Sequence, residues 1–96
     1  MNALLSAGGG GISGFKYTQV TASDTTKSYT TKAAGFLLGD KTDNTLVSIT
    51  KNGATIQIYK TAAKSSVFGI FVAGAIVEAE STHKYEIAVA HIFEFI

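Results

Sequence analysis

The 96-residue chain contains no cysteine, no proline and no tryptophan. Without cysteine it has no disulfide bond, no thiolate ligand for a metal ion and no cysteine nucleophile. Since a chain without cysteine suits oxidising and reducing compartments equally, its composition leaves the compartment open. The absence therefore restricts the chemistry of the protein but not its location.

Charge is also scarce in this sequence. Charged residues make up 16% of the chain, well below the roughly 25% that is usual for soluble domains. The 8 basic and 7 acidic residues give a net charge of +1, so no basic excess favours nucleic acid as the main partner. Few charges on a small domain leave much neutral or apolar surface, which a partner often covers. A threonine- and serine-rich surface that is simply solvated is the alternative.

No hydrophobic run reaches the length of about 18 residues that a membrane helix needs. The longest apolar stretch, VFGIFVAGAIV at 67–77, is interrupted by glycines and followed by Glu78. The first residues, MNALLSA, lack the basic region and the long apolar stretch of a signal peptide. We therefore expect no association with a membrane.

The abundant residues are those that favour strands and turns, namely Thr, Val, Ile, Tyr, Phe, Gly and Ser. Alternating polar and apolar positions, bounded by turn residues at short spacing, predict antiparallel strands. The predicted strands are 15–21, 27–32, 34–40, 45–50, 55–59, 67–73, 75–80 and 85–96. Asn52 and Gly53 separate two alternating runs, which predicts a type I′ hairpin turn. We expect an all-β domain over 15–96, an antiparallel β-sandwich of jelly-roll-like type.

The last predicted strand, 85–96, carries its large side chains on one face. Tyrosine, isoleucine, valine, histidine and phenylalanine alternate from Tyr85 to Phe95, and smaller or acidic residues mostly lie between them. We expect the face with the large side chains, which includes His91, to point toward the core. The predicted strand 67–73 is apolar on both faces. This pattern is typical of a strand at the centre of a sandwich or of a strand that a partner protein covers. The apolar faces of 67–77 and 85–96 are expected to supply both core and interface.

A run of glycines lies near the N-terminus, in AGGGGISG at 7–14. Gly9, Gly11 and Gly14 have the spacing of a dinucleotide-binding loop, G-x-G-x-x-G. Such a loop follows a strand and opens a helix, whereas the segment after this one, FKYTQVT, has a strand pattern. Nucleotide binding is therefore not expected.

The same run is interpreted as a flexible, glycine-rich arm, residues 1–14, because glycine adopts unusual backbone angles without steric cost. We expect the arm to dock Leu4 and Leu5 on a neighbouring subunit. A loose terminus without a role is the alternative.

Few residues in the sequence are candidates for metal binding or catalysis. His83 and His91 are the two histidines, too few for a zinc site in a chain without cysteine. Asp40, Asp43 and Asn44 cluster in GDKTDN, but their spacing does not match a calcium-binding loop, and turn formation is the favoured interpretation. No G-x-S-x-G motif and no positioned base identify a nucleophile. The sequence therefore predicts no enzyme, no metal site and no cofactor.

Two stretches, 30–60 and 67–96, resemble small phage virion proteins. They combine a hairpin of the form V-x-I-x-K-N-G at 47–53 with a later strand and a closing strand that ends the chain. The pattern, over about 25–96, is also similar to the jelly-roll heads of complement-type and tumour-necrosis-factor-like trimers. The resemblance implies a structural role in the virion, such as decorating a capsid, forming a fibre head or joining tail parts, and it brings no catalytic residues.

Taken together, these observations predict a non-enzymatic virion structural protein, a capsid decoration or head/tail fibre component that acts through surface contacts. Its expected partners are copies of itself, with a trimer favoured, and other virion proteins such as the major capsid protein. The predicted interface residues are Leu4, Leu5, Ile12, Phe71 and Ile96. One alternative is a receptor- or carbohydrate-binding module at a fibre tip, using exposed tyrosines or the 40–44 loop. The other is a small enzyme subunit, which needs a cleft of converging polar groups.

Overall fold

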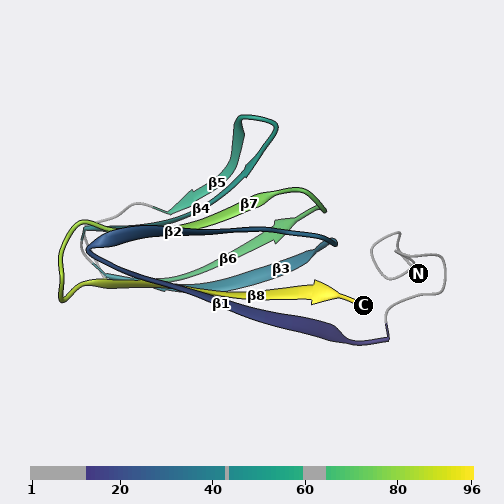
Figure 1. Ribbon diagram of the computed structural model, residues 1–96, viewed down its shortest axis with the longest axis horizontal. Helices are drawn as coiled ribbons and strands as arrows, with labels where there is room; N and C mark the ends of the chain where they lie inside the picture. Colours follow the sequence, from purple (N-terminus) through teal and green to yellow (C-terminus); the bar gives the residue numbers. More distant parts are fainter. Residues whose placement is uncertain (1–12, 43, 60–64) are drawn as a thin grey trace.

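The computed structural model describes residues 13–42, 44–59 and 65–96 of the chain. These residues form eight strands (Figure 1). The strands are β1 (Phe15–Ser23), β2 (Thr25–Thr30), β3 (Gly35–Lys41), β4 (Thr45–Lys51), β5 (Ala54–Tyr59), β6 (Ser65–Phe71), β7 (Ile76–Ser81) and β8 (Ile87–Phe95). No helix that could cross a membrane occurs in the described part of the chain.

The strands form two four-stranded antiparallel sheets that pack face to face. One sheet has the order β1-β8-β3-β6 and the other the order β2-β7-β4-β5. Figure 1 shows them as two layers, with β5, β4, β7 and β2 above β6, β3, β8 and β1. Pairing of the first strand with the last, and chain connections that pass from one layer to the other everywhere except at the β4–β5 hairpin, are features of a jelly roll. The predicted all-β, jelly-roll-like sandwich is therefore confirmed.

The predicted hairpin turn is also confirmed. Asn52 and Gly53 both have positive φ, 52° and 79°, as the two central residues of a type I′ turn require. The turn joins β4 to β5, and a register shift between Ile49 and Thr50 interrupts their pairing. A bulge of this kind increases the local twist of the two strands.

The core lies between the two sheets and is built from the inward positions of both. Its largest fully buried side chains include Leu37, Ile49, Phe71 and Ile92. Small side chains complete it where strands of the two layers pack together, notably the alanines of β1, β7 and β8. Alanine leaves little side chain between the layers, and the β1-β8-β3-β6 sheet directs several of its larger residues outward.

The expected orientation of the last strand is wrong. Ala88, Ala90 and Ile92 of β8 are fully buried, whereas His91 and Phe93 lie on the opposite, half-exposed face. The core next to β8 is filled by side chains from β3, β4, β6 and β7, so it accepts alanine at these positions. The large side chains of β8 pack instead against neighbours on the outer surface of their own sheet.

Gly35, at the start of β3, permits a close approach to β8. A Cβ atom at this position would lie 1.9 Å from the backbone carbonyl oxygen of Phe93. No side chain fits at that distance, so only glycine allows β3 and β8 to pair here. This pairing places Phe36 directly beside Phe93.

The segment before β1 is held by the residue that follows β8. The backbone N–H groups of Ser13 and Gly14 donate to the carbonyl oxygen of Ile96, at 2.6 and 3.1 Å. The Ile96 N–H donates in return to the Gly14 carbonyl oxygen at 3.0 Å. Of the predicted arm 1–14, these two residues therefore extend the β1–β8 pairing, and residues 1–12 lie outside the described ranges.

Candidate functional surface: an aromatic sheet face

The outer face of the β1-β8-β3-β6 sheet gathers large hydrophobic side chains at the surface. Because side chains alternate along a strand, the odd-numbered residues of β1 and β8 lie beside the even-numbered residues of β3 and β6 on this face. We name this surface the aromatic face. Its apolar members are Phe15, Tyr17, Phe36, Leu38, Phe68, Ile70, Ile87, Val89, Phe93 and Phe95. Six of them are 43% to 54% exposed.

Ring contacts join all four strands of this face. The rings of Phe36 and Phe93 stack with centroids 5.0 Å apart, which links β3 to β8. Tyr17 of β1 lies 5.3 Å from Phe93, and Phe68 of β6 stacks on Phe36 at 6.1 Å. Phe15 contacts Phe36 edge-on at 5.9 Å. The rings therefore form one continuous cluster across the sheet.

The opposite outer surface differs in character. Among the described side chains of β2, β7 and β4, Ile76 is the one exposed large hydrophobic residue. Its outward neighbours on β7 are Glu78 and Glu80, both half-buried. Among the side chains that the structure describes, exposed apolar residues are thus concentrated on the β1-β8-β3-β6 sheet, the arrangement typical of a contact surface rather than of random exposure.

A polar chain of residues crosses the aromatic face next to the rings. The amide of Gln19 donates to Thr21, the hydroxyl of Tyr17 donates to Oε1 of Gln19 at 2.9 Å, and the same hydroxyl lies 2.7 Å from Nδ1 of His91. On the far side of the imidazole, Nε2 lies 3.9 Å from Oδ2 of Asp40. Asp40 is the only acidic residue among the described side chains of this face, and no lysine points from it.

The face is large enough for a stable protein contact. Four strands about 4.8 Å apart and a nine-residue strand with a rise of about 3.3 Å per residue give roughly 19 by 30 Å. A standard interface buries about 800 Å² of accessible surface per partner, and protruding side chains have more accessible area than the plane beneath them. In plan the face is about 570 Å², so its accessible area is of the order of one side of a standard interface.

A second polar site lies inside the sandwich, at Glu94 of β8. This carboxylate is 1% exposed. Its Oε1 accepts a hydrogen bond from the hydroxyl of Tyr29 at 2.5 Å, and its Oε2 accepts from the backbone N–H groups of Lys32 and Ala33 at 2.6 and 3.2 Å. Burial raises the pKa of Glu94, but these hydrogen bonds and the nearby positive charge of Lys16 outweigh it, so the pKa lies below its ordinary value. The group is therefore held as a carboxylate.

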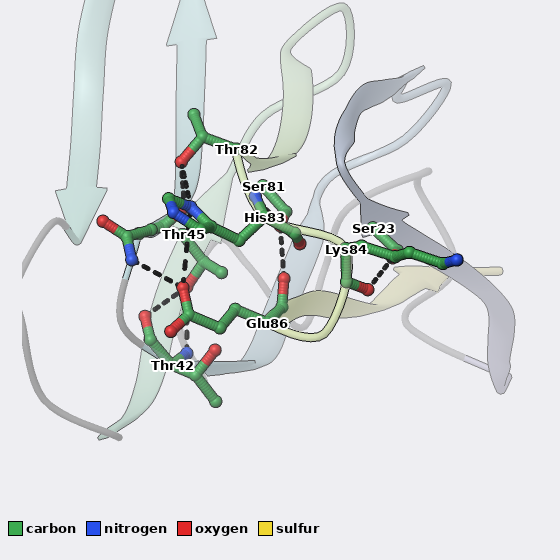
Figure 2. A network of polar contacts seen from close by, with 9 residues as sticks. Ser23, Thr42, Thr45, Ser81, Thr82, His83, Lys84 and Glu86 are labelled. Atoms are coloured by element: carbon green, nitrogen blue, oxygen red, sulfur yellow. Dashed lines mark hydrogen bonds and ion pairs between the residues drawn. The ribbon is translucent and has the colours of Figure 1, made fainter.

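A third polar network closes the end of the sandwich at the β3–β4 and β7–β8 connections (Figure 2). The side-chain amide of Asn44 donates to Oε2 of Glu86 at 2.6 Å, and the hydroxyl of Ser81 donates to the Glu86 carbonyl oxygen. His83 lies 3.8 Å from the same Glu86 carboxylate. Beside this network is a hollow of about 170 Å³, lined by Asn44, Thr45, Leu46, Glu80 and Thr82.

The predicted turn in GDKTDN separates its polar residues. Asp40 points onto the aromatic face, and Asn44, with a positive φ of 59°, directs its amide to Glu86. Asp43 lies outside the described residues. Within the described ranges, no three histidine or acidic side chains come together as a metal site would require.

The predicted interface residues have different positions. Leu4, Leu5 and Ile12 lie outside the described ranges. Ile96 directly follows β8 and is 62% exposed. Phe71 is 2% exposed and belongs to the core, so its side chain packs within its own chain and the prediction is corrected there.

Sequence reasoning missed most of the aromatic face. The neighbours of Phe71 on β6, Phe68 and Ile70, are the ones that point outward. The signal for this was present, because strand 67–73 is apolar on both faces and only one face fits in a core. The alternation of residues along β1 carries the same information. Phe15 and Tyr17 lie at odd-numbered positions and point outward, whereas Val20 lies at an even-numbered position and points into the core.

Comparison of the chain with protein-family models, curated proteins and solved structures found no significant match.

Proposed function

We propose that this protein is a non-enzymatic structural subunit of a virion, a capsid decoration or head/tail fibre component. It acts by assembling with copies of itself, a trimer being favoured, and by contacting other virion proteins such as the major capsid protein. The observation that carries the proposal is the aromatic face, a four-strand apolar surface that a second copy would remove from water.

A second copy suits this face better than a charged partner. The face presents no lysine, so it offers nothing to an anionic polymer, and its one carboxylate offers little to a basic one. A neighbouring copy of this chain, which has few charged residues, can in contrast cover the face without burying an unpaired charge of its own. Aromatic side chains are also the residues that dominate the energetics of protein interfaces.

Light scattering on two matched isoleucine variants tests the proposal. Ile70→Lys places a charge on the aromatic face, where Ile70 is 54% exposed, and Ile76→Lys places the same charge on the opposite sheet, where Ile76 is 42% exposed. We expect the unaltered chain and Ile76→Lys to form the same oligomer and Ile70→Lys to be a folded monomer. A monomeric unaltered chain, or equal masses for both variants, would contradict the proposal.

A receptor- or carbohydrate-binding role is the second candidate. It is favoured by the hollow beside Asn44, Glu80 and Thr82, whose amide, carboxylate and hydroxyl groups suit the hydroxyls of a sugar. Tyr85 follows Thr82 closely in the sequence, in the β7–β8 connection, and is 87% exposed. Its ring offers a surface on which a sugar can stack. Screening a panel of glycans with the unaltered chain and Glu80→Gln tests this role. Specific binding that is lost in the variant would support it.

A further inference from the structure

Strand β6 lies at the edge of the sheet that carries the aromatic face. Among the described strands it pairs with β3 alone, at the end of the order β1-β8-β3-β6. This pairing runs from Gly35 opposite Phe71 to Lys41 opposite Ser65 without a register shift. The seven residues of β6, SSVFGIF, include no charged residue and no proline. A regular, uncharged edge of this kind is a template on which a strand of another chain can pair.

The hydrogen bonds of the sheet show which backbone groups of β6 point to its outer edge. The N–H of Phe95 donates to the carbonyl oxygen of Ala34 at 2.9 Å, so the even-numbered residues of β3 direct their backbone groups to β8. The odd-numbered residues of β3 then bond to the odd-numbered residues that lie opposite them on β6. Ser66 and Ile70, at even-numbered positions of β6, therefore direct their N–H and C=O groups away from β3.

The other three edge strands each have a feature that hinders such pairing. Lys16 of β1 and Lys27 of β2 are exposed and lie opposite buried residues of β8 and β7, so both lysines are on the inner side of their sheets. The Nζ atom of Lys16 lies 5.9 Å from the centre of the Tyr29 ring. The register shift between Ile49 and Thr50 twists the β4–β5 hairpin, whose tip stands away from the other strands in Figure 1. Inward-pointing charges and bulges both protect sheet edges, and β6 has neither.

We propose that β6 pairs in antiparallel orientation with β6 of a second copy, around a two-fold axis perpendicular to the sheet. This axis keeps the aromatic faces of the two copies on the same side and joins their four-stranded sheets into one of eight strands. The contact is closed, because each copy uses the same edge. The inference goes beyond the proposed function, since the backbone of the sheet edge makes the contact and the aromatic faces stay open to further partners.

A register centred on Gly69 gives the best match between the side chains of the two copies. Phe68 of each copy then lies opposite Ile70 of the other on the aromatic face, and Val67 lies opposite Phe71 on the inner face. Each of these pairs sets an aromatic residue opposite a β-branched one, a combination that stabilises antiparallel strands. A register centred on Phe68 instead sets Val67 opposite Gly69 and loses this match.

Cross-linking between two single-cysteine chains tests the pairing and its register, because the unaltered chain has no cysteine. Ser66 and Val72 are both exposed. In the proposed register Ser66 of one copy lies opposite Val72 of the other, with Cβ atoms about 5 Å apart. We expect a mixture of Ser66→Cys and Val72→Cys chains to be joined by a short bis-maleimide. Either variant alone is the control, since its two cysteines would be about 20 Å apart.

A proline at position 70 separates the edge contact from coverage of the aromatic face. Ile70→Pro removes an N–H that points away from β3, so the hydrogen bonds inside the sheet are kept. Ile70→Ala is the matched control, because it shortens the same side chain and keeps the N–H. By symmetry the proline removes two hydrogen bonds from the pair of copies. Sedimentation should therefore give a dissociation constant about tenfold or more higher for Ile70→Pro than for Ile70→Ala, with circular dichroism to confirm folding.

The outcomes distinguish the inference from the proposed function. Cross-linking in the mixture alone, together with weaker association of Ile70→Pro than of Ile70→Ala, supports the pairing. An oligomer without this cross-link, or equal dissociation constants for the two variants, overturns the pairing and leaves association through the aromatic face standing. A cross-linked pair whose mass is unchanged by Tyr17→Lys, a charge on the aromatic face at β1, supports the pairing and contradicts the proposed role of the face. A monomeric unaltered chain overturns both.

Discussion

The hydroxyl of Tyr29 donates a hydrogen bond to the buried carboxylate of Glu94, and this bond joins the two sheets of the sandwich. Tyr29 belongs to β2 in one sheet and Glu94 to β8 in the other. The second carboxylate oxygen is bound by two successive backbone N–H groups in the β2–β3 connection. One side chain thus fixes a strand of one layer, a connection and a strand of the other layer.

Replacing Glu94 by glutamine is expected to destabilise the fold. Glutamine has the same shape but turns one oxygen into an amide donor, which faces either the Tyr29 hydroxyl or the two N–H groups. Lost charge-assisted hydrogen bonds in a buried site cost about 1–3 kcal/mol. Denaturant unfolding at one protein concentration measures the change in free energy. Tyr29→Phe, alone and combined with Glu94→Gln, completes a double-mutant cycle. If the two single losses of unfolding free energy added up to the loss in the double variant, the direct contact would be contradicted.

The stability of the protein should fall in acid because of the same group. The folded state holds the pKa of Glu94 below the ordinary 4.5, so the folded protein binds the proton less readily than the unfolded chain does. The stabilisation is therefore complete above the ordinary value and is lost as the pH falls through the lowered pKa. Unfolding measured from pH 7 to pH 3 should show a smaller decline in Glu94→Gln than in the unaltered chain. Parallel declines would show that other groups are responsible.

Gly35→Ala should be strongly destabilising. Its Cβ atom would overlap the Phe93 carbonyl oxygen, so β3 and β8 must separate. Overpacking typically costs about 1–3 kcal/mol, and a clash with backbone lies at the upper end of that range. Gly14→Ala is the matched control, because its Cβ would meet Ile96 at 3.7 Å, an ordinary contact. We expect a lower thermal midpoint for Gly35→Ala and an unchanged one for Gly14→Ala.

Deleting residues 1–12 should weaken assembly and leave the sandwich folded. Ser13 and Gly14 remain, so the hydrogen bonds to Ile96 are kept. The segment that is removed contains Leu4, Leu5 and Ile12, the apolar residues predicted to dock on a neighbouring subunit. Light scattering across a dilution series compares the two chains. An unchanged oligomer would show that the arm has no part in assembly and that the aromatic face is sufficient.

Strand positions and the hairpin turn could be predicted from the sequence because both depend on local properties. Alternation locates a strand, and Asn52-Gly53 is suited to positive φ wherever it lies. The inward face of β8 could not be predicted in this way. Phe93 is a better core residue than Ala90 in isolation, and a glutamate such as Glu94 ordinarily marks its face of a strand as exposed. Buried glutamate is accepted only because Tyr29 and the β2–β3 connection supply donors, and these contacts depend on the complete fold.

The same limit applies to the candidate surface. Phe71 and Ile70 are adjacent and both strongly apolar, so hydrophobicity does not tell which of them points outward. The pairing of β3 with β6 determines which of the two side chains points outward, because it sets Phe36 beside Ile70 and Gly35 beside Phe71. Long-range register therefore decides which side chains form the contact surface.

The pairing of β1 with β8 has a consequence for the order of events during folding. Phe15 lies opposite Phe95, so the two strands meet only after almost the whole described chain has been brought together. Contacts of such large sequence separation form slowly, because the entropy of closing the loop is lost before the contacts form. Until then the rings of β1 and β8 are not assembled into one surface. A chain that has not closed lacks the complete aromatic face, so under the proposed self-association only fully folded chains would offer it to a second copy.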